Sequence, residues 1–332
     1  MPKLWPGRSQ PSASLSSFAA VLLVTAACVA AAAFAARTAI HASAPPEQPN
    51  LPPFDTNTSL LVVSPHPDDE SLCCAGVIQR VLKSGGRASV VWITSGDGSE
   101  LDLIVVEKSL FTNPDKLRDL ALRRMEEARA AAKVLGIPAE QQFFLGYPDR
   151  GLLNLITDNY ITPYRSKYTG ASSVPYPNTL SPGHPYTGQN LEQDFESVLD
   201  RVQPTLILAP SPEDLHPDHR ASGILTIRAL SRRQELSKVR YWIVHGGPVW
   251  PRPRGLHLDR SLTPAPRSRG LAPVPFLLDP AEEQRKLEAV RTYQTQMEVM
   301  SSYLLGFVRT NELFSSIPVP DRTAGVTSAG TE

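Results

Sequence analysis

From residue 57 onward, short apolar runs alternate with longer segments in which apolar residues recur every three or four positions. Continuous short runs are typical of strands buried on both faces, and the recurrence is typical of amphipathic helices. The pattern predicts strands at 60–64, 89–94, 142–145, 205–209 and 241–244. It predicts helices at 71–83, 117–135, 191–201, 221–230 and 280–303. Strands that alternate with helices favour an α/β fold with a mostly parallel sheet and helices on both faces.

Two long segments interrupt this alternation. Residues 152–190 form a polar, aromatic and proline-rich insert, and residues 248–275 form a basic, proline-rich loop. Loops of this length in a compact domain are usually functional lids or disordered. We expect one domain at 57–315, with a proline-rich linker at 38–56 before it and a flexible tail at 316–332 after it.

The segment before the linker has the pattern of an export signal or a membrane anchor. An N-terminal tail at 1–17 carries Lys3 and Arg8, and residues 18–37 begin with an uncharged apolar run long enough to cross a bilayer. Basic residues before such a run place the following chain outside. A cleaved signal peptide is the alternative, because residues 42–44 form a small-residue site. Both interpretations predict an exported domain, and a retained segment would attach it to the membrane.

Charge and cysteine usage exclude several classes of protein. The formal net charge is zero, so the basic surplus typical of nucleic-acid-binding proteins is absent. The three cysteines imply neither a disulfide framework nor a four-cysteine zinc site. Cys73 and Cys74 are adjacent, and we expect them to be unpaired, small packing residues.

Polar motifs follow three of the predicted strands. HPDD (66–69) follows the first, TSGDG (94–98) follows the second, and HPDH (216–219) follows the strand at 205–209. The carboxyl ends of parallel strands share one edge of the sheet, where open α/β folds bind their ligands. We therefore expect the three motifs to converge.

The first and third motifs contain the residue types of a metal site. His66 and Asp69, and likewise His216 and His219, are spaced i, i+3, so each pair can reach one point. Two histidines and a carboxylate, with water in a fourth position, form a catalytic zinc site. The mixed donors also suit Fe2+ or Mn2+. A lone histidine is more often a buried structural residue, but two such pairs after separate strands favour a metal.

The acidic residues beside the candidate ligands can share the remaining chemistry. If the metal takes Asp69, Asp68 is free to act as a general base on water whose pKa the metal lowers to about 7. Attack on an amide carbonyl creates an oxyanion, which needs another positive donor. One histidine of HPDH is available for this, and Asp218 can orient it and hold it charged. Glu70 suits a helix start, where a carboxylate complements the dipole, and is not expected to be a ligand.

Four segments stand in the order and spacing of a known family. They are SPHPDDE (64–70), RRMEEARAAAKVLGI (123–137), FFLGYPDRGL (143–152) and HPDH (216–219). Over about 57–315 the chain resembles the N-acetylglucosaminyl-phosphatidylinositol de-N-acetylase (PIG-L) family and its bacterial LmbE-like relatives. The resemblance implies a Rossmann-like domain without a dinucleotide. It also implies a zinc-dependent hydrolase of linear amide C–N bonds, which removes acetyl groups from N-acetylated amino sugars.

The resemblance also implies a role for each matching residue. The metal ligands would be His66, Asp69 and His219. Asp68 would be the general base, His216 would stabilise the oxyanion and protonate the amine, and Asp218 would orient His216.

Three further residues are predicted to contact the substrate. Arg124 and Asp149 match an arginine that faces the substrate and a carboxylate that binds sugar hydroxyls, and His245 ends a strand at the active edge. Arg124 is equally compatible with a helix-surface position paired to Glu126 or Glu127, and aspartate is common in turns for local reasons. The tyrosines of the insert would either stack on sugar rings or anchor the loop: Tyr164, Tyr168, Tyr176 and Tyr186.

Other functions remain compatible with the same motifs. An exported N-acetylated polysaccharide, glycolipid or secreted metabolite suits the N-terminal segment, but the site could also hydrolyse a non-sugar amide or ester. A non-catalytic carbohydrate-binding protein would require a damaged motif, and no candidate residue is missing. A dinucleotide oxidoreductase would need Gly-x-Gly-x-x-Gly after the first strand, where HPDD stands instead.

Overall fold

The computed structural model describes residues 51–98 and 113–315. The predicted tail at 1–17, the apolar segment at 18–37, most of the linker and the tail at 316–332 lie outside these residues. Within the described ranges, no helix is both long and apolar enough to cross a membrane.

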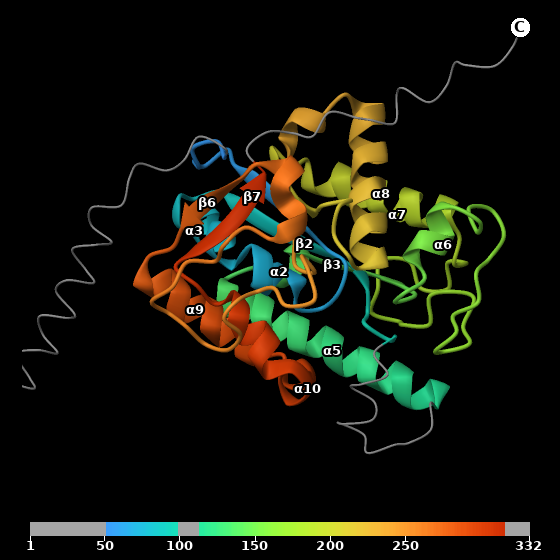
Figure 1. Ribbon diagram of the computed structural model, residues 1–332. Coiled ribbons are helices and arrows are strands. Elements are labelled where there is room, and N and C mark those ends of the chain that lie inside the picture. The colour runs from blue at the N-terminus through green and yellow to red at the C-terminus, as the bar shows by residue number, and fades with distance from the viewer. Residues whose placement is uncertain (1–50, 99–112, 316–332) are drawn as a thin grey trace, which may run out of the picture. The chain divides into compact units, whose positions relative to one another are not determined.

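A five-stranded sheet lies at the centre of the domain (Figure 1). Its strands run in the order β3 (Gln142–Tyr147), β2 (Arg87–Thr94), β1 (Ser59–Ser64), β4 (Leu206–Pro210) and β5 (Val239–Trp242). Every neighbouring pair is parallel, and the strand order reverses between β1 and β4. Open α/β sheets bind their ligands at such a switch point. Each strand ends within two residues of the predicted run, and the predicted α/β fold is confirmed.

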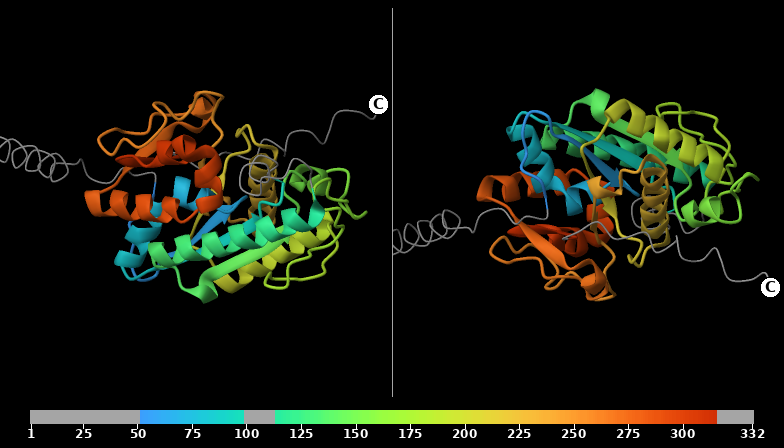
Figure 2. Two further views of the ribbon diagram at one scale, coloured as in Figure 1. Left: turned by 90° about the horizontal axis from the view of Figure 1, so that it is seen from below. Right: turned by 90° about the horizontal axis from the view of Figure 1, so that it is seen from above.

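The two faces of the sheet carry separate hydrophobic cores, because successive side chains of a strand point to opposite faces. Leu60 and Val62 pack into one core and Leu61 and Val63 into the other. The first core is covered by α2 (Asp69–Cys73), α3 (Ala75–Lys83), α5 (Pro114–Leu135), α9 (Pro280–Arg291) and α10 (Gln294–Leu304). The second is covered by α6 (Leu152–Ile156), α7 (Gly188–Val202) and α8 (Pro217–Arg233) (Figure 2).

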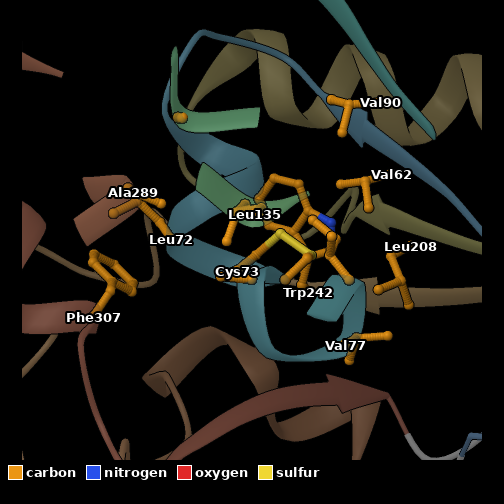
Figure 3. Packing of buried hydrophobic residues seen from close by; sticks show 14 of the residues in the cluster. Val62, Leu72, Cys73, Val77, Val90, Leu135, Leu208, Trp242, Ala289 and Phe307 are labelled. Carbon is orange, nitrogen blue, oxygen red and sulfur yellow. A yellow bond between two sulfur atoms is a disulfide. The ribbon is translucent and has the colours of Figure 1, made fainter. Parts of the chain in front are cut away.

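Cys73 and Cys74 form a disulfide, so the expectation that they remain unpaired is wrong. Figure 3 shows this bond among packed side chains of the first core. In a continuous helix over 71–83, neighbouring side chains would diverge by about 100°. The helix instead breaks at Cys74, whose φ of −136° and ψ of 5° are not helical, and this break lets the two sulfurs meet.

A second, two-stranded antiparallel sheet is not predicted by the apolar pattern. It pairs β6 (Pro273–Leu277), whose start lies in the predicted loop, with β7 (Asn311–Ser315). Two of the five residues of β6 are prolines, which hide the strand pattern, and two helices separate it from its partner. The single helix predicted at 280–303 is in fact α9 followed by α10.

The insert at 152–190 folds back onto the domain. Tyr176 and Tyr186 are fully buried; their hydroxyls donate to the Asp97 carboxylate and to the Gly146 carbonyl, respectively. These two tyrosines therefore anchor the insert, which is one of the two predicted alternatives.

Candidate active site

The three polar motifs converge at the carboxyl edge of the sheet, as predicted. They contribute to the lining of a cavity of about 140 Å³. Its polar lining includes His66, Asp68, Asp69, Gly98, Arg124, Asp149, Arg150, His216, His245 and Gln296. Its apolar lining consists of Leu72, Val244, Met300 and Leu304, with the ring of Tyr303 beside them.

The three predicted ligands place one donor atom each around a single point. His66 Nδ1 lies 3.3 Å from Asp69 Oδ2, and His219 Nε2 lies 3.1 Å from the same oxygen. The two histidine nitrogens are 3.3 Å apart. Ligands at about 2.0–2.1 Å from a tetrahedral zinc lie roughly 3.3–3.4 Å from one another. The spacing of these atoms therefore fits three corners of a tetrahedral metal site.

In each of the two histidine ligands, the ring nitrogen that is not a candidate donor to the metal faces a carboxylate. His66 Nε2 lies 3.3 Å from Asp218 Oδ2 and 3.4 Å from Asp149 Oδ1. His219 Nδ1 lies 3.3 Å from Asp214 Oδ2, an electrostatic contact rather than a well-aligned hydrogen bond. Carboxylates in these positions orient ligating imidazoles and raise their basicity. Asp214 was not among the predicted site residues, although it stands only two residues before HPDH.

These carboxylates also set the protonation of the imidazoles. Burial by itself would lower the pKa of His219, but Asp69 and Asp214 outweigh burial and raise this pKa to about 9. The pKa of His66 is raised as well, against the effect of burial, chiefly by Asp149. Positions that hold protons this tightly also favour a bound cation, which would replace those protons.

Asp68 lies beside the three ligand atoms but is not one of them. Its carboxylate lines the cavity, and its Oδ2 is 3.6 Å from Arg124 Nη2. Burial, followed by the negative charge of Asp69, raises its pKa well above the usual range, and Arg124 acts in the opposite direction. A carboxylate with a raised pKa at the edge of a metal site is well suited to accept a proton from water.

His216 is the N-cap residue of α8, and its side chain bonds to the first turn of that helix. Its Nδ1 accepts the Asp218 N–H at 3.3 Å, so a neutral ring carries its proton on Nε2. Burial, and then the neighbouring His66 and His219, lower its pKa to about 2. The Asp218 carboxylate accepts from the Arg150 and Leu152 N–H groups and contacts His66, while its main-chain N–H donates to His216. The role of its carboxylate in orienting His216 stays a prediction.

Arg124 is buried and faces the cavity rather than the helix surface. Its guanidinium donates to the Gly96 and Pro67 carbonyls at 3.0 and 3.1 Å. Gly96 has a φ of +70°, and a Cβ there would lie 2.3 Å from Arg124 Nη1, so this position requires glycine.

Asp149 and His245 also line the cavity. Asp149 Oδ2 accepts the Gly98 N–H at 3.1 Å, which fixes the carboxylate between the second motif and His66. His245 Nδ1 lies 3.2 Å from the hydroxyl of Tyr303, which also donates to the Val244 carbonyl at 3.0 Å.

A known family model covers the segment that carries these motifs. The family model described as GlcNAc-PI de-N-acetylase matches residues 61–230, just over half of the 332-residue chain. The chain belongs to the GlcNAc-PI de-N-acetylase family.

Curated proteins similar to this family member are deacetylases of N-acetylglucosamine-containing compounds. The diacetylchitobiose deacetylase of Thermococcus kodakarensis is 27% identical over 184 residues, which cover 54% of this chain and 51% of that protein. A probable N-acetyl-alpha-D-glucosaminyl L-malate deacetylase of Bacillus subtilis is 26% identical over 256 residues, which cover 76% of this chain and 90% of that protein.

The chain spans about half the length of several curated relatives, including the Thermococcus enzyme. Among solved structures, the A40926 pseudoaglycone deacetylase has a TM-score of 0.48 at 22% identity and covers 74% of this chain and 85% of that one.

One wall of the cavity in this family member comes from outside the matched segment. Gln296, Met300, Tyr303 and Leu304 all lie on α10. These four residues do not belong to a recognisable sequence motif, because their position in the site depends on how α10 packs against the first core.

Proposed function

We propose that this chain is a metal-dependent de-N-acetylase, which hydrolyses the acetamide of an N-acetylated amino sugar to a free amine and acetate. His66, Asp69 and His219 would hold the metal. Zinc suits their two nitrogens and one oxygen, and Fe2+ or Mn2+ also suits them. The observation that carries the proposal is the spacing of 3.1–3.3 Å among the three donor atoms with the free carboxylate of Asp68 beside them.

The residues around the metal divide the reaction between them. The bound metal would supply a Lewis acid and lower the pKa of the attacking water to about 7. Asp68 takes the proton from this water and holds it for the leaving amine. The Nε2–H of His216 donates to the oxyanion, because its Nδ1 is occupied by the Asp218 N–H. This geometry favours oxyanion stabilisation over amine protonation as the role of His216.

The cavity suits the reacting group rather than a whole sugar. Its volume of about 140 Å³ is close to that of an engineered cavity that holds one benzene molecule. Arg124 and Asp149 offer a donor and an acceptor for sugar hydroxyls at the polar side. Leu72, Val244, Met300 and Leu304 offer an apolar surface for the acetyl methyl group.

The apolar segment at 18–37 supports the further proposal that the domain acts outside the cytoplasm. An N-acetylated polysaccharide, glycolipid or secreted metabolite would then be the substrate class. Fractionation of cells that express the full chain, with and without residues 18–37, tests this placement. Recovery of the full chain in the cytoplasm would contradict it.

Acetate release by the metal-loaded full chain tests the proposed activity. The panel should pair N-acetylglucosamine, its short oligomers and its glycosides with non-sugar acetamides and acetate esters. We expect acetate from the amino sugars, and we expect chelation to abolish it and zinc to restore it. Preferential release from the non-sugar compounds would replace the proposal with a general metal-dependent amidase or esterase.

A further inference from the structure

Glu70 is a fully buried carboxylate that the proposed chemistry does not use. It follows Asp68 and Asp69 in the first turn of α2, where the sequence predicts a simple role at the helix start. Instead, side-chain donors surround it. Its Oε2 accepts the Trp92 Nε1–H at 3.0 Å, and its Oε1 accepts the hydroxyls of Ser71, at 2.6 Å, and of Tyr293.

The neighbouring Asp68 has an unusual main-chain conformation. Its φ is 127° and its ψ is −32°, in a region that side chains with a Cβ rarely adopt. Such a conformation persists only where the surrounding structure holds it, and it is found most often at functional sites. Here the strained residue is the proposed general base.

Glu70 contacts the strained unit directly. Its Oε2 accepts the main-chain N–H of Asp68 at 3.4 Å, while the Asp68 carbonyl accepts the Ser71 and Leu72 N–H groups at 3.0 and 3.1 Å. Trp92 on β2 and Tyr293, between α9 and α10, fix the carboxylate from two sides. The Asp68 main chain is thus tied, through Glu70, to the sheet and to the C-terminal helices.

Both oxygens of Glu70 accept hydrogen bonds, and the donors in these contacts are all neutral groups. Oε2 faces the N–H groups of Asp68 and Trp92, which can only donate. Oε1 faces the hydroxyls of Ser71 and Tyr293, which can also accept, so a glutamine with its oxygen toward the N–H groups keeps all four contacts. Removal of the whole side chain is therefore the change that releases the Asp68 main chain.

We propose that Glu70 is a positioning residue, which holds the main chain of Asp68 in its strained conformation and thereby fixes the general base against the attacking water. This inference rests on the proposed function, because Asp68 acts as a base only in that reaction. Glu70 itself touches neither the metal site nor the substrate cavity.

The substitution Glu70→Ala tests the inference in the zinc-loaded full chain. We expect kcat to fall by about 100-fold, since small misplacements of catalytic groups have effects of this size. KM and the metal content should stay close to those of the unmodified protein, because the substrate contacts and the three ligands are untouched. Tyr293→Phe removes one donor and keeps the carboxylate, so we expect a smaller loss of kcat in the same direction.

Glu312→Ala is the matched control. Glu312 is also a buried carboxylate, but it accepts the Gly76 and Val77 N–H groups at the start of α3 and pairs with Lys286 at 2.8 Å. We expect this variant to be less stable, with the kcat of its metal-loaded fraction unchanged. Equal losses of kcat in the Glu70 and Glu312 variants would overturn the inference, as would an unchanged kcat in Glu70→Ala. If Glu70→Ala fails to fold, an unchanged kcat in Tyr293→Phe overturns it.

A crystal structure of the metal-loaded variant supplies a measurement that does not depend on turnover. In Glu70→Ala, or in Tyr293→Phe if the first does not fold, we expect Asp68 to leave the positive-φ region while Asp69 keeps its place. Retention of the positive φ would contradict the inference. If the unmodified chain releases no acetate from any amino sugar, the proposed function fails, while this structural result still shows whether Glu70 holds Asp68.

Discussion

The two walls of the cavity differ in how they are built. The ligand wall carries His66 and Asp69 where β1 passes into α2, and His219 in the first turn of α8 completes the set without lining the cavity. All three residues lie within the part of the chain that the family model matches. The facing wall carries Met300 and Leu304 on α10, beyond residue 230 where that match ends. The first wall consists of imidazole and carboxylate groups that contact one another. The second is mostly apolar, and α10 also contributes Gln296 and Tyr303 to it.

This difference suggests a division of roles, in which the ligand wall carries out the chemistry and the α10 wall sets which acyl group fits. The ligand wall follows from topology, because strand ends bring the motifs together whatever lies opposite. The α10 wall can vary in size without moving any ligand. We therefore expect changes in the ligand wall to remove metal or turnover, and changes in the α10 wall to alter only which acyl group is accepted.

The largest expected effect is that of Asp69→Ala. Asp69 Oδ2 is within 3.1–3.3 Å of both ligand nitrogens, so its loss removes one of the three donors. We expect the purified variant to lack stoichiometric metal and to show no measurable acetate release. Elemental analysis measures the metal content, and a full complement would exclude Asp69 as a ligand.

Asp68→Ala should separate turnover from metal binding at the same wall. The variant keeps all three donor atoms, so we expect a normal metal content. Loss of a general base should lower kcat by about 100-fold or more. Unchanged turnover would remove Asp68 from the mechanism.

Asp97→Asn tests a fully buried carboxylate of the TSGDG motif, whose hydrogen-bond partners in the described structure are neutral groups. Asp97 accepts the Asp149 N–H and the Tyr176 hydroxyl, and burial, followed by the charge of Asp149, raises its pKa from 3.8 to about 7. Between these values the folded state binds more protons than the unfolded state, so stability falls as pH rises.

Asparagine does not titrate in this range. The stability of the variant relative to the unmodified protein should therefore increase by about 2 kcal/mol between about pH 5 and pH 7. Urea unfolding at several pH values measures this slope, and parallel curves for the two proteins would show that Asp97 is ionised throughout.

The elements that the sequence predicts well are those fixed by local pattern. The five strands are continuous apolar runs, and the HPDD and HPDH motifs stand in the loops that follow two of them. The sequence does not predict Asp214 as a site residue, because an aspartate in a loop after a strand has no distinctive sequence pattern. Spacing alone cannot show which imidazole a carboxylate reaches, and in the structure the Asp218 carboxylate contacts His66. The disulfide depends on a helix break at Cys74 that periodicity does not reveal.

Asp214→Asn should weaken metal binding without removing a ligand. The asparagine loses the negative charge that faces His219 Nδ1, and losses of such outer carboxylates cost about 10–100-fold in metal affinity. Competition with a chelator of known affinity measures the change. Asp194→Asn is the control, because Asp194 is also buried and also contacts a histidine, His184, but lies in the second core. Equal losses in both variants would indicate a general effect of buried carboxylates.

Met300→Ala should have the smallest effect on the acetyl substrate and should act on selectivity alone. Met300 is half-buried and lines the cavity opposite the ligands, so its truncation makes room for a longer acyl chain. A few methylene groups in an apolar pocket change relative kcat/KM by about tenfold or more. We expect the ratio of kcat/KM for N-butyryl- over N-acetylglucosamine to rise by this factor, with metal content unchanged.

Met297→Ala is the matched control, because Met297 lies one turn earlier on α10 and packs on the same core without lining the cavity. If both variants change the ratio equally, α10 acts through its overall packing, and the contrast between a chemical wall and a selective wall fails.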